Sequence, residues 1–203
     1  MAVSSGRRWS DGTGSGALRG IILEVQAVTP DLDKWLPDPA IRITHQRQSA
    51  VPAEELWKAA GELRLADTYL LGRLIRWRIP GLAADSSFED LFSSPPFAVL
   101  SRDDRSLVSG LVGRIWTLRR DYPAVDPGGF RDWSRSGTAK VVFAHWVAQL
   151  DGNRSMLHSE ARLEAFGTQG RLGLASVRPL IRAFEYLVGS DALAAAVRSA
   201  ERA

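Results

Sequence analysis

The alternation of hydrophobic and polar positions changes its period along the chain, and each period predicts an element. Residues 40–50 (AIRITHQRQSA) alternate apolar and polar side chains, which is typical of a half-buried strand. This alternation places Ile41, Ile43 and His45 on one face of the strand. Pro52, followed by two glutamates, predicts that a helix begins directly after it.

The middle of the chain predicts two helices, two strands and a long loop. They lie at about residues 52–61, 65–78, 97–102, 106–116 and 119–137. The pattern of residues 87–92 leaves the element type open. The loop 119–137 is rich in Pro and Gly, and loops of this length in a compact domain are usually functional or mobile.

Residues 138–150 and 154–166 predict a hairpin around the turn Asp151-Gly152-Asn153. This turn sets a register that separates the cross-strand pairs into two faces. One face is apolar except for His145 and Ser159, and its pairs are Val147/Leu157, His145/Ser159, Phe143/Ala161 and Val141/Leu163. The other face pairs Trp146/His158, Ala144/Glu160, Val142/Arg162 and Lys140/Glu164, and in this register we expect Glu160 and Arg162 to face solvent.

Residues from about 169 to 201 predict one long helix with an apolar stripe formed by Leu174, Val177, Ile181, Phe184 and Val188. At about 1.5 Å per residue it is roughly 45 Å long. Strands of the hairpin, at about 3.3 Å per residue, reach roughly 43 Å. A helix as long as the hairpin can lie along a curved antiparallel sheet and bury its stripe there, which is an α+β arrangement.

Composition places the 203-residue chain among average globular domains, with 45% hydrophobic and 24% charged residues. The absence of cysteine excludes a disulfide framework, a thiolate zinc site and a cysteine nucleophile. A net charge of +3 is too small to argue for a nucleic-acid partner. No apolar run is long enough for a membrane span or a secretory signal, so we expect a cytoplasmic protein.

The first residues are rich in Ser, Gly and Arg, a composition that predicts a tail. Prolines at positions 30, 37 and 39 mark a linker. We therefore expect residues 1–35 to form a mostly flexible N-terminal tail and residues 36–203 to form one folded domain.

The order of these segments resembles a known superfamily. A strand and two helices (IRITHQRQSAVPAEELWKAAG, DTYLLGRLIRW), a run of strands, the segment HSEARLEAF and a long closing helix (LGLASVRPLIRAFEYLV) are similar to START-like, helix-grip (SRPBCC) proteins. That superfamily includes polyketide cyclases, plant pathogenesis-related proteins and lipid-transfer domains, and the chain more closely resembles its uncharacterised bacterial members. The resemblance implies a curved sheet that grips the C-terminal helix around an apolar cavity, with a hydrophobic small molecule inside. The five strands counted here are fewer than is usual in that superfamily.

These observations favour a soluble binding protein for a small hydrophobic ligand of lipid, polyketide or isoprenoid class. The expected binding residues are Phe143, His145, Val147, Ser159, Ile181, Phe184 and Glu185. Burial of the ligand supplies affinity, and polar groups orient it. A buried His145 or Ser159 needs a partner, which is the other member of the pair, a water or a ligand.

Two alternatives stay open. One is a polyketide-cyclase-like enzyme in which His145 is the general base. The other is a protein-interaction module that uses the aromatic residues of the loop from Trp116 to Trp133 and needs no ligand. No spacing of His, Asp and Glu suggests a metal site, and we expect no cofactor, no nucleic-acid partner and no membrane span.

Overall fold

Five antiparallel strands form one curved sheet in the computed structural model, which describes residues 29–68, 70–78, 82–117, 119 and 121–202. The strands are β1 (Ile41–Ser49), β2 (Ala98–Asp103), β3 (Ser106–Gly113), β4 (Ala139–Gln149) and β5 (Ser155–Ala165). Their spatial order is β1-β5-β4-β3-β2. The first strand of the sequence thus pairs with the last.

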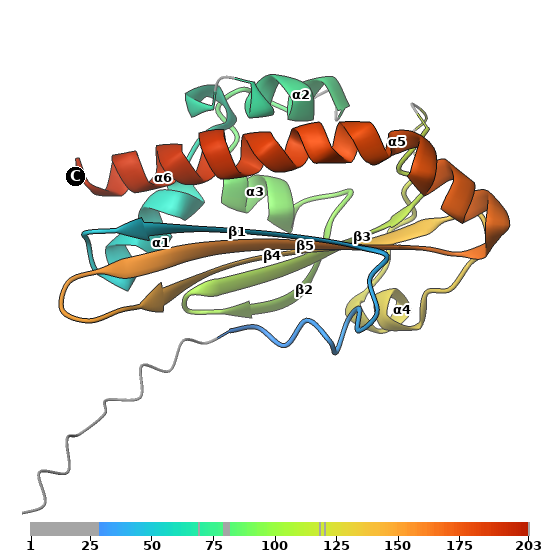
Figure 1. Cartoon of the computed structure of the whole chain (residues 1–203), viewed down its shortest axis with the longest axis horizontal. Coiled ribbons are helices and arrows are strands. Elements are labelled where there is room, and N and C mark those ends of the chain that lie inside the picture. The colour runs from blue at the N-terminus through green and yellow to red at the C-terminus, as the bar shows by residue number, and fades with distance from the viewer. Residues whose placement is uncertain (1–28, 69, 79–81, 118, 120, 203) are drawn as a thin grey trace, which may run out of the picture.

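Helices lie in the connections from β1 to β2 and from β3 to β4, and further helices follow β5. Two α-helices and a short 3₁₀ turn follow β1, and they are α1 (Ala53–Glu62), η1 (Leu65–Asp67) and α2 (Leu71–Arg78). Two short helices, α3 (Phe88–Ser93) and α4 (Pro127–Asp132), flank the β2–β3 hairpin in sequence. The chain ends with α5 (Gly167–Leu187), the π-helical turn η2 (Val188–Ala192) and α6 (Leu193–Ala200). Figure 1 shows α5 and α6 running along one side of the sheet, with α4 and the N-terminal segment on the other.

The predicted hairpin register is confirmed. His145 pairs with Ser159 and Val142 pairs with Arg162, and every other pair expected from the sequence is also present. Leu150 N–H donates to the carbonyl of Arg154 across the turn, at 2.8 Å. The left-handed conformation at Gly152 (φ 61°) suits this turn because glycine has no Cβ to clash.

The long closing helix is also present, with a π-helical turn inside it. This turn places the Asp191 carboxylate 3.2 Å from the N–H of Leu70 and 3.4 Å from that of Leu71, and both donate to it. Because the first N–H groups of a helix have no partner within it, Asp191 caps the beginning of α2. The π-helical turn thus ties α2 to the closing helix.

Three local expectations change in the structure. The second predicted helix is divided, because the Thr68 hydroxyl bonds the carbonyl of Leu65 and then accepts from Gly72 N–H, and α2 begins only at Leu71. The open segment 87–92 is helical, with Ser87 and Asp90 forming a capping box. The expected loop 119–137 contains the short helix α4.

The N-terminal segment covers part of the outer face of the sheet, which is the face that carries Glu160 and Arg162. We call residues 31–36 the N-terminal strap. Leu32, Trp35 and Leu36 are buried and pack in one cluster with outward-facing side chains of β3 and β4. The division of the chain at residue 36 stays a prediction, although two of these buried residues lie on the tail side of it. Residues 1–28 of the expected tail lie outside the described residues.

Candidate functional site

A hollow of about 330 Å³ lies between the inner face of the sheet and the closing helix. Strands β1, β4 and β5 form its floor, and α1, α2, α3 and the η2–α6 region contribute side chains around it. Most of the lining is aliphatic or aromatic, including Ile43, Val141, Leu157, Leu163, Ile181 and Leu193. The sheet and helix stripes are therefore both apolar here but do not fill the space between them.

An aromatic cluster forms one wall of this hollow. The Phe92 ring lies 5.2 Å from that of Phe97 and 5.4 Å from that of Phe143, measured between centroids. The ring of His145 lies 4.7 Å from Phe92. Tilted ring pairs at these separations are favourable contacts, so α3 and the β2–β4 region are joined through ring packing.

A polar row crosses the otherwise apolar floor. His45 on β1 lies opposite Ser159 on β5, and Ser159 lies opposite His145 on β4. All three residues line the hollow. In the described part of the chain, the buried Nε2 atoms of His45 and His145 have no hydrogen-bond partner. Burial lowers the pKa of His145 to about 4, so its imidazole is neutral at pH 7.

The charged lining residues come from α3 and β2. The Arg102 guanidinium donates to the Glu89 carboxylate and to the Ser93 hydroxyl, both at 2.6 Å. The side chains of Arg102 and Glu89 are about half exposed, so water also solvates them. Asp103 is exposed and also lines this side. The charge of Arg102 is therefore compensated within the protein.

The structure brings together four of the seven expected binding residues. Phe143, His145, Ser159 and Ile181 all line the hollow. Val147 is buried in the adjacent core cluster with Leu107 and Leu157 but does not line the hollow. The side chains of Phe184 and Glu185 lie outside the described part of the structure, so their expected roles stay predictions.

Sequence reasoning placed His45 on the inner face of its strand but not in the site. The missing information was the pairing of β1 with β5, which joins residues more than a hundred positions apart. The helical side chains of the site, such as Trp57, Leu71 and Ile75, were also missed. Their periodicity indicates burial only and does not say which surface they cover.

The expectation that Glu160 and Arg162 face solvent was wrong. Both point to the outer face, as the register requires, yet they are only 5% and 6% exposed. Arg162 Nε donates to Glu160 at 2.6 Å, and Arg42 on β1 pairs with the same carboxylate at 2.8 Å. The physical reason is the N-terminal strap, which lies over this face and excludes water from it.

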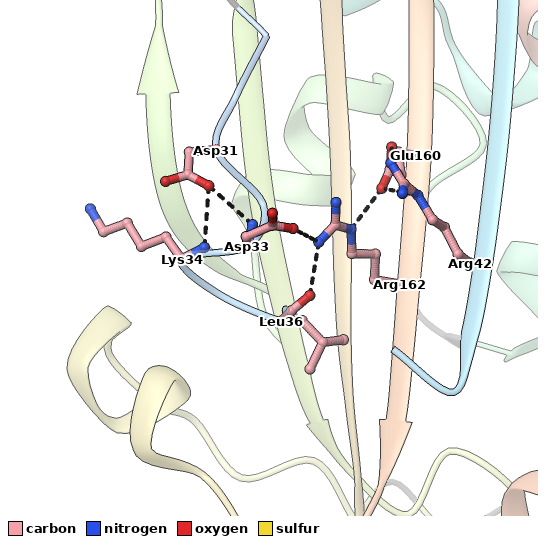
Figure 2. A network of polar contacts seen from close by, with 7 residues as sticks. All are labelled: Asp31, Asp33, Lys34, Leu36, Arg42, Glu160 and Arg162. Atoms are coloured by element: carbon pink, nitrogen blue, oxygen red, sulfur yellow. Dashed lines mark hydrogen bonds and ion pairs between the residues drawn. The ribbon is translucent and has the colours of Figure 1, made fainter. Parts of the chain in front are cut away.

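Figure 2 shows how Arg162 holds the strap. Its Nη1 donates to the Asp33 carboxylate and to the carbonyl of Leu36, the latter at 2.8 Å. Burial alone lowers the pKa of Arg162, but the hydrogen bonds to Asp33 and Glu160 and the negative charges of these carboxylates together outweigh it and raise that pKa. The hydrogen bond from Arg162 also lowers the pKa of Asp33. These contacts of Arg162, which we call the Arg162 network, fix the N-terminal strap to the face of the sheet opposite the hollow.

Among the described residues, no group of three or more His, Cys, Asp or Glu side chains is placed to hold a metal ion. None of the helices in that part of the chain combines the length and apolar character that a membrane crossing needs.

The curved antiparallel sheet, its strand order and the long helix across it give this chain an α+β helix-grip fold, as the resemblance implied. No family model and no curated protein matches the chain. Its structural neighbours include polyketide aromatase/cyclases and hypothetical proteins.

A hypothetical protein from Helicobacter pylori is 9% identical, with a TM-score of 0.37 over 98% of this chain and 96% of its own. Zhui aromatase/cyclase from Streptomyces sp. R1128 is 15% identical, with a TM-score of 0.31 over 80% of this chain and 94% of its own. The di-domain ARO/CYC protein BexL of the BE-7585A biosynthetic pathway is 13% identical, with a TM-score of 0.35 over 79% of this chain and 46% of its own.

Proposed function

We propose that the chain binds a small, predominantly hydrophobic ligand in the hollow between the sheet and the closing helix. The observation that carries the proposal is the apolar space of about 330 Å³, which is within the usual range of small-molecule sites. Transfer of apolar ligand surface from water into this space supplies the affinity, at about 25 cal/mol per Å² buried. Lipid, polyketide and isoprenoid molecules stay the candidate classes, and the cytoplasmic location stays a prediction.

The cyclase-like alternative has less support. His145 lies at the hollow, as a general base must, but its pKa of about 4 makes it a weak base at neutral pH. General-base catalysis works best when the pKa lies near the working pH. Binding without turnover therefore accounts better for this environment.

The protein-interaction alternative is also less supported, because the aromatic residues of the loop region are engaged within the chain. Phe130 is fully buried, and Trp133 Nε1 donates to the Thr138 hydroxyl at 3.0 Å. Trp116 packs so closely on α5 that a Cβ at Gly173 would lie 2.3 Å from its ring. Phe130 is therefore closed to a partner, and Trp116 and Trp133 are only partly exposed.

Titration with N-phenyl-1-naphthylamine, an uncharged fluorescent hydrophobic probe, tests the proposal. We expect saturable binding to the wild-type protein. Ala161 lines the floor of the hollow, so Ala161→Trp fills part of the space and is expected to weaken binding at least about tenfold. Ala183→Trp makes the same change at an exposed position of α5 and is expected to leave binding unchanged.

Two results would contradict the proposal. One is the absence of saturable binding by the wild-type protein. The other is unchanged binding by an Ala161→Trp variant whose circular dichroism and urea unfolding show that it is folded.

A further inference from the structure

His45 and His145, whose buried Nε2 atoms have no hydrogen-bond partner among the described residues, lie in one cross-strand row on the floor of the hollow. His45, Ser159 and His145 occupy matching positions on the adjacent strands β1, β5 and β4. Because neighbouring strands lie about 4.8 Å apart, the main chains of the two histidines are roughly 10 Å apart. The separation is comparable to the length of a small ring system, and a single ligand can reach both imidazoles.

Within the described residues, the two unpaired Nε2 atoms carry a free-energy cost that a ligand can remove. A buried donor or acceptor without a partner costs about 1–3 kcal/mol. Within the described residues, both Nε2 atoms are buried and unpaired, and the wall around them is apolar. A ligand that presents a hydrogen-bonding group to each of them recovers this cost, and a purely hydrocarbon ligand does not.

The positions of the charged residues that line the hollow limit which hydrogen-bonding groups the ligand can carry. The described charged residues of the hollow belong to α3 and β2 and not to the histidine row, and Arg102 among them is already paired with Glu89. His145 is neutral at pH 7 and supplies no positive charge. Transfer of an ionised group from water into such surroundings is strongly unfavourable.

From this arrangement we infer that the ligand is uncharged and carries two hydrogen-bonding oxygen groups, one for His45 Nε2 and one for His145 Nε2. The inference rests on the proposed binding function and adds the polar pattern of the ligand. Hydroxyl and carbonyl oxygens both fit, because a hydroxyl both donates and accepts a hydrogen bond and a carbonyl accepts one from an imidazole N–H. Ser159 lies between the two anchor points.

Displacement of N-phenyl-1-naphthylamine by naphthalene, 2-naphthol and 2,6-dihydroxynaphthalene tests the inference on the wild-type protein. The three probes share one apolar body and carry zero, one and two hydroxyl groups. We expect each hydroxyl to tighten binding about tenfold, the fold-change that corresponds to one net hydrogen bond. The dianion 2,6-naphthalenedicarboxylate is expected to bind more weakly than the diol.

Variants then assign the effect to the two histidines. His45→Leu and His145→Leu are each expected to reduce the advantage of the diol over naphthalene about tenfold while naphthalene binding stays the same. His158→Leu is the matched control, because His158 lies on the opposite face, stacked on Trp146. It is expected to leave the whole series unchanged.

The outcomes separate this inference from the proposed function. If the fluorescent probe binds but the diol binds no tighter than naphthalene, or the dianion binds tighter than the diol, the inference is wrong and the binding function stands. If the fluorescent probe does not bind, the binding function itself fails. Because the probe series is measured on the wild-type protein, a leucine variant that does not fold leaves this decision intact.

Discussion

At the scale of single residues, the two faces of the hairpin differ in whether their buried polar groups have hydrogen-bond partners. On the outer face, Arg162 donates hydrogen bonds to Glu160, to Asp33 and to the carbonyl of Leu36. On the inner face, the Nε2 atoms of His45 and His145 have no partner among the described residues. A complete network stabilises a structure, whereas unpaired buried groups favour a ligand that pairs with them.

Replacing Arg162 with methionine tests the outer network. The substitution keeps most of the buried volume but leaves the Glu160 carboxylate with Arg42 alone. We expect the free energy of unfolding in urea to fall by about 3 kcal/mol, the lower end for breaking a buried ion pair. Arg154→Met is the control, because Arg154 pairs with Asp151 at the exposed turn and its loss should change stability little. An equally small effect of Arg162→Met would contradict the stabilising role of the Arg162 contacts.

The buried His145 predicts a pH dependence of stability. Its pKa is about 4 in the folded protein and near 6.5 when unfolded. Between these values the unfolded chain binds more protons, so stability decreases as the pH falls. We expect a loss of about 2 kcal/mol between pH 7 and pH 5 from this residue. Urea unfolding at both values should show a smaller loss for His145→Leu, and the same loss in both proteins would contradict the prediction.

At the scale of elements, the N-terminal strap and α4 together cover the outer face. The ring of Trp35 meets that of Phe130 edge-on, at 6.3 Å between centroids. Lys140 on β4 donates to the carbonyl of Arg131 at 2.9 Å, which fixes the end of α4. Both covering elements are short, so they depend on the sheet for their stability.

Removal of the Trp35 side chain tests how firmly the strap is held. Trp35 is 4% exposed, and Trp35→Ala is expected to lower the free energy of unfolding by about 3–5 kcal/mol because it leaves a cavity on the sheet. Trp77→Ala is the control, since Trp77 on α2 is 60% exposed, and a change within about 0.5 kcal/mol is expected there. Urea unfolding measures both, and equal effects would mean that the strap contributes little.

At the scale of the whole molecule, the same sheet has a filled face and a hollow face. The outer face is packed by the strap and α4, and its polar side chains bond one another. On the inner face, the helices meet the sheet around a space that their side chains do not fill. The filled face stabilises the sheet, and this offsets the stability that the open volume on the inner face costs.

The hairpin register and the closing helix could be predicted because their signals are local. The turn Asp151-Gly152-Asn153 and the alternation on each side of it select one register, and every predicted pair is present. The division of the second helix was not predictable in this way, because it depends on the position of the Thr68 hydroxyl in the folded chain. Local periodicity thus predicts elements better than it predicts their ends.

By itself, the sequence determined the α+β class, the hairpin register and the inward direction of His145 and Ser159, since these follow from periodicity and turn length, whereas the helix-grip arrangement was implied by the resemblance. Only the tertiary structure decided that His45 joins their row and that Glu160 and Arg162 are buried. The contacts of Arg162 with Asp33 and Leu36 join residues 129 and 126 positions apart. Alternation tells which face of a strand a side chain takes, but what covers that face depends on distant segments that meet only when the chain folds.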